Sequence, residues 1–192
     1  LFSVARTAGA TTFDYTTTAA RTATYTATDG ALSDAATATV QFDAGTINGG
    51  FGAEISVGDG ANTAINGGFG NDIIFSGAGN DTVDGGFGDD TLVWNAGDGR
   101  DLLNGGANAT ANGDLVRIEG NADSEAYVVY SRVAATNNGI VGLAATTEIV
   151  ITRNGQVIVE LDNVEEILIN TGDGSDTVTT IGDFTPTSLN FN

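Results

Sequence analysis

The chain has 192 residues, with 25 acidic residues against six arginines and no lysine, histidine or cysteine, so its formal net charge is −19. This charge argues against nucleic acid or an anionic membrane surface as a partner, because both would be repelled. The missing residue types exclude disulfides, zinc–thiolate sites, histidine-based catalytic triads and Schiff-base chemistry. Since 41% of the residues are hydrophobic and follow short patterns, we expect a folded chain rather than a disordered one.

No apolar run approaches the about 18 residues of a membrane span, and we expect no membrane insertion. The first residue is Leu1 rather than methionine, so we expect a fragment or a processed product.

Residues 1–45 are rich in threonine and alanine, and two stretches alternate between apolar and polar residues. The alternation predicts strands over 22–28 and 37–42, and Asp29-Gly30 between them predicts a hairpin. Because two or three strands cannot enclose a core, we expect them to dock on the rest of the chain or on another chain. We interpret the threonines as solvated strand faces rather than as an ice- or sugar-binding array. The segment also resembles the last strands of a cadherin-like or immunoglobulin-like bacterial repeat, in Ala-Thr-Asp-Gly followed by Ala-Thr-Ala-Thr-Val.

Residues 46–104 repeat a phrase of nine residues and hold 15 of the 28 glycines. Glycine takes places 1, 2 and 4 of the phrase, an acidic residue usually takes place 6, and an apolar residue usually takes place 8. The first six residues predict a tight turn, because glycine tolerates backbone angles that a β-carbon forbids, and the last three predict a short strand. Two such units form one coil of 18 residues, so equivalent places recur on the same edge. Successive coils are expected to stack about 4.8 Å apart.

The acidic places fall into two rows along the predicted coils. The rows contain Glu54, Asp72 and Asp90 on one edge, and Thr63, Asp81 and Asp101 on the other. Carboxylates at this spacing would repel one another unless cations lay between them. Turn carbonyls converge at the same edges, and carboxylate and carbonyl oxygens are the ligands of calcium, which takes about 6–8 of them. Residues 49–104 carry nine acids and one base, so the pattern predicts calcium binding and a region that folds only with the metal.

Residues 105–192 are less regular but keep short β-branched runs, and Asn154-Gly155 predicts a hairpin between two of them. Residues 171–179 repeat the phrase once more, and Gly105-Gly106, followed after an insertion by Asp114, resembles an interrupted copy. We therefore expect the stacked architecture to continue with longer coils. The expected divisions of the chain are a flanking β segment at 1–45, a calcium-binding roll at 46–120, and an irregular continuation at 121–192.

The nine-residue tract resembles the calcium-binding β-roll of the repeats-in-toxin (RTX, hemolysin-type) family, whose unit is Gly-Gly-x-Gly-x-Asp-x-apolar-x. The resemblance implies an all-β fold, a right-handed parallel β-roll or β-solenoid with flanking strands, and Ca²⁺ as the bound ion. It also implies type I secretion from a Gram-negative bacterium, with folding outside the cell. The side-chain ligands that it implies are Glu54, Asp72, Asp81, Asp90, Asp101 and Asp176. The carbonyl ligands that it implies belong to Gly67, Asn71, Asn80, Gly85 and Asp89. Glu54 departs from the family pattern by one extra methylene.

Three phenylalanines share place 3 of the phrase and recur every 18 residues, at Phe51, Phe69 and Phe87. We expect them to stack in one column. Two interpretations stay open: local stacking within the roll, or a docking strip for residues 1–45 or a neighbouring molecule. Trp94 stands at the insertion that interrupts the phrase, where we expect it to cap the core rather than to stack on a sugar.

The sequence favours a calcium-dependent structural module of a secreted bacterial surface protein, such as an adhesin, a surface layer or a filament. An exposed strand edge would allow self-assembly into a homo-oligomer or filament by strand addition. The alternative is a calcium-stabilised module that binds a glycan or a cell surface through Trp94 and the phenylalanine column. We do not expect an enzyme, because the acids form rows rather than one distinctive pair. A calcium-assisted polysaccharide lyase with Arg100 as base is the catalytic alternative.

Overall fold

The structure is a computed structural model and describes residues 21–27, 36–43, 45–184 and 188–191. Its regular elements, in chain order, are β1 (Arg21–Ala27), β2 (Ala36–Asp43), β3 (Thr46–Asn48), β4 (Ile55–Gly58), β5 (Ala64–Asn66), β6 (Ile73–Phe75), β7 (Thr82–Phe87), β8 (Thr91–Asn95), β9 (Asp101–Ala107), β10 (Leu115–Glu119), β11 (Ala126–Ser131), α1 (Arg132–Asn137), β12 (Ile149–Arg153), β13 (Gln156–Asp162), β14 (Glu166–Asn170), β15 (Thr177–Ile181) and β16 (Ser188–Phe191). Across these described ranges, no helix has the length and apolar character needed to cross a membrane.

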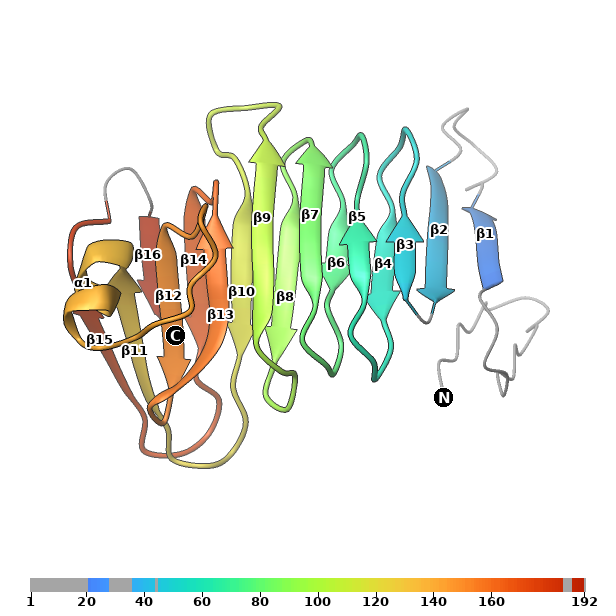
Figure 1. Ribbon diagram of the computed structural model, residues 1–192. Helices are drawn as coiled ribbons and strands as arrows, with labels where there is room; N and C mark the ends of the chain where they lie inside the picture. Colours follow the sequence, from blue (N-terminus) through green and yellow to red (C-terminus); the bar gives the residue numbers. More distant parts are fainter. Residues whose placement is uncertain (1–20, 28–35, 44, 185–187, 192) are drawn as a thin grey trace.

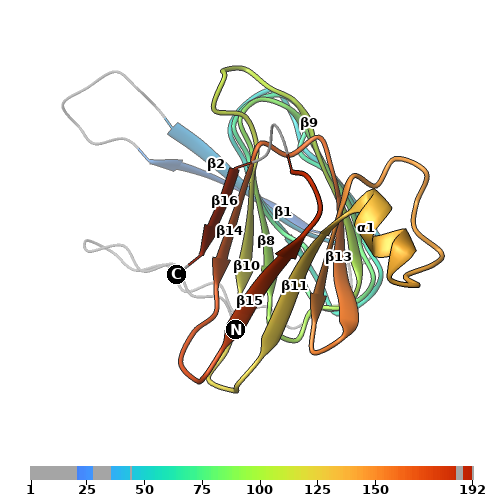
Figure 2. The same ribbon diagram turned by 90° about the vertical axis from the view of Figure 1, so that its left-hand side faces the viewer.

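The strands form two sheets of eight strands each, and Figure 2 shows the sheets facing one another. One sheet has the order β1-β2-β4-β6-β8-β10-β14-β16, and the other has the order β15-β11-β12-β13-β9-β7-β5-β3. From β3 to β10 the chain changes sheet at every strand, so the even-numbered strands lie side by side in one sheet and the odd-numbered strands in the other (Figure 1). Neighbours within this part are parallel. The expected all-β roll is therefore confirmed.

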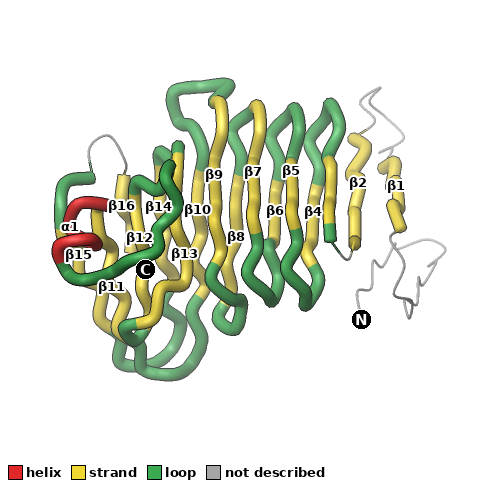
Figure 3. The backbone as a smooth tube through the Cα atoms, viewed as in Figure 1, coloured by secondary structure: helices red, strands yellow, loops and turns green. Residues whose placement is uncertain are grey.

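The pairing of neighbouring coils follows the period of the sequence. In one sheet Ile73 pairs with Thr91, a step of 18 residues. The steps then lengthen while the pairing stays parallel: Thr91 pairs with Leu115, and Leu115 pairs with Glu166. Figure 3 shows the connecting loops gathered at the two edges of the roll, with longer loops toward the C-terminal end. The later coils thus contain more residues, but their strands still pair in parallel with those of the preceding coil.

The core is a column of side chains that the two sheets point at one another. The place-8 side chains are all buried, as predicted: Ser56, Ile65, Ile74, Val83, Leu92 and Leu103. The C-terminal part continues the column with further apolar residues, among them Tyr127, Ile151, Leu161, Ile167 and Ile169. Trp94 is 1% exposed, and its indole N–H donates to the carbonyl of Gly99 at 2.9 Å. The tryptophan therefore belongs to the core, and its burial rules out a sugar-stacking role.

The N-terminal strands extend the roll. β1 and β2 pair antiparallel, as the predicted hairpin requires, and β2 pairs in parallel with β4. The expectation that these strands dock on the rest of the chain is thus met by strand pairing at the end of one sheet. The turn at Asp29-Gly30 lies outside the described residues, as does most of the segment that resembles a cadherin-like or immunoglobulin-like repeat.

The C-terminal part keeps the stack but interrupts it. β14 pairs in parallel with β10, and β13 with β9, which continues both sheets. Between them β11, β12 and β13 form an antiparallel meander, whose predicted turn has Asn154 and Gly155 at φ 52° and 78°. These left-handed values suit a two-residue hairpin and explain the Asn-Gly pair. Both sheets contain strands from the predicted roll and from its continuation, and the boundary at 120/121 stays a prediction.

The short helix α1 was not predicted from the sequence. It begins after Ser131, whose hydroxyl accepts a hydrogen bond from the backbone N–H of Ala134 at 3.4 Å. It ends at Asn138, whose backbone N–H donates to helix carbonyls. A stretch of this length is governed by its two caps rather than by an apolar period, so the sequence pattern gives it little weight.

Candidate metal centre

The acidic residues of one edge form a chain of hydrogen bonds that passes from coil to coil. The backbone N–H of Glu54 donates to Oδ1 of Asp72 (2.7 Å), and the N–H of Asp72 donates to Oδ1 of Asp90 (2.7 Å). The N–H of Asp90 donates to Oδ1 of Asp114 (2.7 Å), and the N–H of Asp114 donates to Oε2 of Glu165 (2.9 Å). The structure therefore brings the predicted row together and continues it past its last predicted member. We call this chain of acids the long ladder.

The opposite edge carries a shorter ladder of the same kind. The N–H of Thr63 donates to Oδ1 of Asp81 at 2.6 Å, and the N–H of Asp81 donates to Oδ1 of Asp101 at 3.0 Å. The two-residue insertion before Asp101 does not break the alignment, because the extra residues Trp94 and Asn95 lengthen β8. Thr63 has no charge, so this ladder begins with a backbone donor and contains two acids.

Each ladder aspartate uses one carboxylate oxygen and leaves the other without a hydrogen-bond partner. The residues with a buried, unpartnered Oδ2 are Asp72, Asp81, Asp90, Asp101 and Asp114. All five are 2% exposed or less. A buried, uncompensated carboxylate oxygen is costly, and buried charges in proteins are normally paired or coordinate a metal. Within the part of the chain that the structure describes, these five oxygens are the strongest indication of cation binding.

The metal-free electrostatics of the ladders are correspondingly unfavourable. Burial raises the pKa of Asp72, Asp101 and Asp114 to about 7, and neighbouring carboxylates add to the rise. Burial likewise raises the pKa of Asp81 and Asp90. Without a cation the buried carboxyl groups therefore keep their protons to a higher pH than free aspartates do. A bound divalent cation would favour the charged form instead.

The place-1 glycines let a carbonyl and a carboxylate meet at the same point. A β-carbon at Gly67 would lie 2.3 Å from the carbonyl oxygen of Gly85 and 2.6 Å from Oδ2 of Asp72. A β-carbon at Gly85 would lie 2.3 Å from the carbonyl oxygen of Gly105 and 2.5 Å from Oδ2 of Asp90. Each slot thus combines the orphaned carboxylate oxygen of one coil with a carbonyl of the next coil. The predicted carbonyl ligand Gly85 lies beside Asp72 for this reason.

Glu54 occupies the equivalent position but does not form the same slot. Its extra methylene turns the carboxylate back into its own turn, where Oε2 accepts from the N–H of Gly50 at 3.2 Å. Its Oε1 also lies toward Gly50 and Gly52. The first predicted ligand of the long ladder therefore has an arrangement different from that of Asp72 and Asp90.

The predicted residues at place 5 form a second set of ladders. Their side chains accept hydrogen bonds from the coil that follows, whereas the place-6 acids accept from the coil that precedes. Oδ1 of Asn71 accepts from the backbone N–H of Asp89 at 3.1 Å, and Oδ1 of Asn80 accepts from that of Arg100 at 2.9 Å. The Asp89 carboxylate accepts from the hydroxyl and the N–H of Thr110, which lowers its pKa. These side chains fasten successive turns, which leaves their carbonyls as the predicted ligand atoms.

Asp176 stands in a ladder of its own. Its Oδ1 accepts from the backbone N–H of Glu125 at 2.8 Å, the same bond that links the acids of the long ladder. Glu125, however, is 2% exposed and forms an ion pair with Arg153, and the hydroxyl of Tyr127 donates to its Oε2 at 3.5 Å. At this coil an arginine supplies the positive charge beside the buried acid.

Two members of the long ladder escaped the sequence prediction of ligands. Asp114 stands directly before Leu-Val, just as the aspartates of the phrase stand directly before their strands, and this position could have marked it as a ligand. The insertion between Gly106 and Asp114 interrupts the nine-residue period and makes that signal weaker. Glu165 follows Asp114 by 51 residues and belongs to no copy of the phrase, so no periodic signal marks it.

The residues present fit calcium only if carbonyl oxygens take part. Among the described residues no group of three or more acidic side chains converges on one point. Calcium takes about 6–8 oxygens and accepts backbone carbonyls readily, whereas zinc prefers nitrogen and sulfur ligands. Slots built from one buried carboxylate oxygen and a carbonyl of the next coil match the calcium donor set in chemical type. The bound ion would supply positive charge to the carboxylates.

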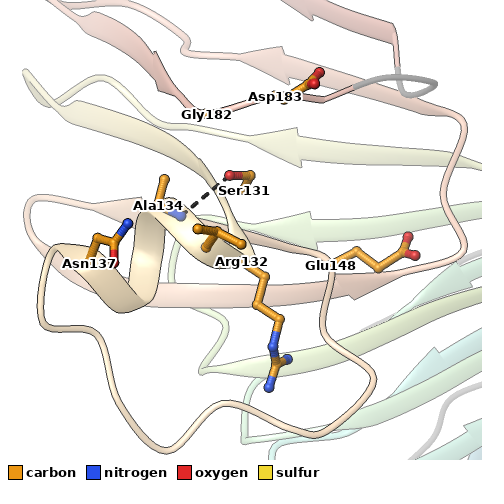
Figure 4. Close-up of a pocket in the computed structure, with 8 residues that line it drawn as sticks. Ser131, Arg132, Ala134, Asn137, Glu148, Gly182 and Asp183 are labelled. Atoms are coloured by element: carbon orange, nitrogen blue, oxygen red, sulfur yellow. Dashed lines mark hydrogen bonds between the residues drawn. The ribbon is translucent and has the colours of Figure 1, made fainter.

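A pocket beside α1 is lined by residues of the helix and by Glu148, Gly182 and Asp183. Figure 4 shows its lining, in which the Ser131 hydroxyl is engaged with the N–H of Ala134. The guanidinium of Arg132 extends away from Ser131 and donates to the carbonyls of Ala144 and Thr147. The metal slots, rather than this pocket, hold the unusual chemistry of the described residues.

Comparison with known families matches residues 57–92 to the RTX calcium-binding nonapeptide repeat, in four copies. The matched segment contains Asp72, Asp81 and Asp90, and thus members of both ladders. Comparison with the curated proteins and with the solved structures gives no match. The matched segment includes the slot residues Gly67 and Gly85, whereas Asp101 and Asp114 lie beyond it.

Proposed function

Because residues 57–92 belong to the RTX calcium-binding nonapeptide repeat family, we propose that the chain is a calcium-dependent structural module of a secreted bacterial surface protein. The module folds when it meets calcium outside the cell and forms part of an adhesin, a surface layer or a filament. The observation that carries the proposal is the set of five buried aspartate oxygens without a partner.

The charge balance explains why the metal would control folding. Residues 49–104 contain nine acids and one base, and the ladders hold their carboxylates one coil apart. Ions that bind the folded roll but not the unfolded chain stabilise the fold by mass action, by about 2.7 kcal/mol at a calcium concentration 100 times Kd. A chain with this charge stays expanded where calcium is scarce and becomes compact where it is plentiful.

Self-assembly is the second part of the proposal. Among the described strands, β3 and β15 end one sheet, and β15 has mostly exposed side chains. A strand at the end of a sheet offers unpaired backbone donors and acceptors to another strand. Calcium would promote assembly indirectly, because only the folded roll has such edges.

The test is a calcium titration of the purified chain at neutral pH and low salt. Circular dichroism follows the strand signal, and sedimentation follows compaction and self-association in the same samples. We expect a gain of strand signal and compaction with calcium, and no gain with equal ionic strength of sodium chloride. A chain that is equally compact in excess chelator would contradict calcium-dependent folding. A compact monomer at saturating calcium would contradict self-assembly alone.

The same proposal holds that the chain is not an enzyme. Arg100, the base of the lyase alternative, donates through Nε and Nη2 to the Glu160 carboxylate, at 3.0 and 2.5 Å. A base held in this way is engaged in an ion pair rather than poised over a substrate. If calcium-loaded protein degraded acidic polysaccharides and Arg100→Ala abolished this activity, the lyase alternative would replace our proposal.

The glycan- or surface-binding alternative now depends on the phenylalanine column alone, since Trp94 is buried. Phe51, Phe69 and Phe87 are 89%, 47% and 56% exposed, and their rings stack at 5.1 and 4.9 Å between centroids. Neighbouring ring faces cover each other, and Phe51, at one end of the column, is the most exposed of the three rings. Glycan-array binding that disappears in Phe69→Ala, while calcium-induced folding persists, would favour this alternative.

A further inference from the structure

The long ladder continues beyond the residues that match the repeat family. The match ends at residue 92, yet Asp90 donates its N–H to Asp114 as Asp72 does to Asp90, in both cases at 2.7 Å. Asp114 lies immediately before β10, at the position that the earlier ladder acids hold before β6 and β8. The sequence step has grown from 18 to 24 residues, but the spatial step is the same.

The surroundings of Asp114 reproduce the slots of the repeats. Asp114 is 0% exposed, and its Oδ2 has no hydrogen-bond partner. A β-carbon at Gly105 would lie 2.5 Å from this oxygen and 2.1 Å from the carbonyl oxygen of Asn163. The corresponding distances at Gly85 are 2.5 Å to Oδ2 of Asp90 and 2.3 Å to a carbonyl oxygen. Asn163 thus takes the place that a glycine carbonyl holds in the earlier coils.

The left-handed backbone of Asn163 accounts for this replacement. Its φ is 49°, in the region that favours glycine and that asparagine enters more readily than most residues. The chain can therefore turn there as the glycine-rich phrase does, although the phrase is absent. The Nδ2 group of Asn163 also donates to Oδ1 of Asn104 at 2.9 Å, which ties this turn to β9.

Glu165 completes the coil. Its Oε2 accepts the N–H of Asp114 at 2.9 Å, and its own N–H donates to the carbonyl of Asp114 at 3.2 Å. None of the three ion pairs among the described residues involves Asp114 or Glu165. A buried, orphaned carboxylate oxygen and a second acid thus meet without an arginine between them.

We propose that Asp114, the Asn163 carbonyl and Glu165 form a further calcium site outside the nonapeptide repeats, assembled from residues about 50 positions apart. The inference rests on the proposed function and extends it to residues that no repeat marks. An ion here would connect the start of β10 to the turn before β14. It would thereby join the two ends of the long segment that contains the meander and α1. Metal binding that joins distant residues stabilises a fold by linking their order.

The test counts ions and locates them. Calorimetric titration with calcium at about pH 8, where free carboxyl groups are ionised, compares the wild-type chain with Asp114→Asn. We expect the variant to bind one ion fewer. The control is Glu148→Gln, which removes an exposed acid from the segment between β10 and β14 and should bind as many calcium ions as the wild-type chain. Asparagine also mimics a neutral carboxyl group, so an unchanged ion count in Asp114→Asn would mean that Asp114 is merely buried and protonated, and would overturn the inference.

Hydrogen exchange of the wild-type chain keeps the test decisive if Asp114→Asn fails to fold. Calcium should protect the backbone amides at 114–116 and 163–166 as strongly as those at 81–92. Protection confined to 81–92 would overturn the inference and leave the proposed function intact. A wild-type chain that binds no calcium would overturn both. Glu165→Gln, which keeps an oxygen acceptor for the Asp114 N–H, should weaken calcium protection at 114–116 without changing that at 81–92.

Discussion

The coils before β10 and the strands after it treat buried acids in opposite ways. In the coils, five aspartates of the two ladders each leave a buried carboxylate oxygen without a partner. After β10, Glu125 is paired with Arg153, and Glu160 accepts hydrogen bonds from Arg100, Thr147 and the N–H of Ala144. Burial by itself would raise the pKa of Glu160, but these hydrogen bonds outweigh it and lower the pKa. One part of the molecule leaves its buried acids open to ions from solution. The other places arginines beside them, Arg153 from its own strands and Arg100 from the turn between β8 and β9.

The difference teaches that one stacked architecture can be stabilised in two ways. In the coils, the strands from β3 to β6 bury one side chain each, and the edges are rich in acids. In the C-terminal part, β11 to β14 have five to seven residues each, and arginines lie beside the buried acids. We therefore expect calcium to govern the order of the coils far more than that of the meander. The predictions that follow break or sharpen this contrast, from the largest expected effect to the smallest.

Removal of calcium should separate the two parts most clearly. In excess chelator the amides of β5 to β9 should exchange at least about 100-fold faster than at saturating calcium, because about 2.7 kcal/mol of ion binding is lost. The amides of β12 and β13 should change much less. Hydrogen exchange with mass spectrometry measures both in one sample. Equal loss of protection in both parts would show a single cooperative unit and contradict the contrast.

Breaking the Arg153–Glu125 pair should destabilise the C-terminal part with or without calcium. In Arg153→Met the Glu125 carboxylate stays buried without its cation, and we expect a loss of about 3–5 kcal/mol in the free energy of unfolding. Urea denaturation at saturating calcium and in chelator measures it. The double variant Arg153→Met/Glu125→Gln, which also removes the orphaned charge, should recover part of the loss. A loss that extra calcium abolishes would mean that the metal can replace the arginine.

A β-carbon in a slot should affect only the coils. In Gly85→Ala the new carbon would meet the carbonyl of Gly105 and Oδ2 of Asp90, and we expect a cost of about 1–3 kcal/mol with weaker calcium binding. Gly60→Ala is the matched control, since a β-carbon there meets nothing within 4 Å. Calcium titration of the circular dichroism signal compares the two. Similar midpoints for both variants would contradict the close approach of the coils at Gly85.

Acid should partly replace calcium in the coils. The folded pKa values of Asp72, Asp101 and Asp114 are raised to about 7, so the metal-free fold is most favoured at low pH and loses stability as the pH rises through about 7. In chelator, lowering the pH from about 8 to about 5 should therefore restore some strand signal. With calcium present, the same change should weaken ion binding, because the ligands become protonated. Loss of strand signal on acidification in chelator would contradict the raised pKa values.

The nine-residue period was enough to predict the coils and the ladders that they contain. It fixed which residues share an edge, because Asp72 and Asp90 must coincide if every coil has the same length. It also predicted the place-8 core, the stacked phenylalanines and the position of Trp94. The Asn154-Gly155 hairpin was predictable for another reason, since the left-handed turn has a strong residue preference.

The site beyond the repeats could not be predicted because its parts depend on tertiary structure. Glu165 reaches Asp114 only after the chain has formed the meander and α1 between them. Arg153 and Glu125 meet across antiparallel strands, and no local pattern links them. Glu54 shows the opposite case. Its place in the phrase predicts a ligand, whereas its longer side chain lies in its own turn, where Oε2 accepts from the N–H of Gly50.

Because the two kinds of ladder have opposite hydrogen-bond directions, loss of a side chain from each kind should weaken a different neighbouring coil. A place-6 acid accepts from the backbone of the coil before it, as Asp90 does from Asp72, whereas a place-5 side chain accepts from the coil after it, as Asn71 does from Asp89. Loss of an acid therefore loosens the neighbour on its N-terminal side, and loss of a place-5 amide loosens the neighbour on its C-terminal side. A coil that carries both kinds of acceptor, such as the one with Asn71 and Asp72, is therefore linked to both of its neighbours.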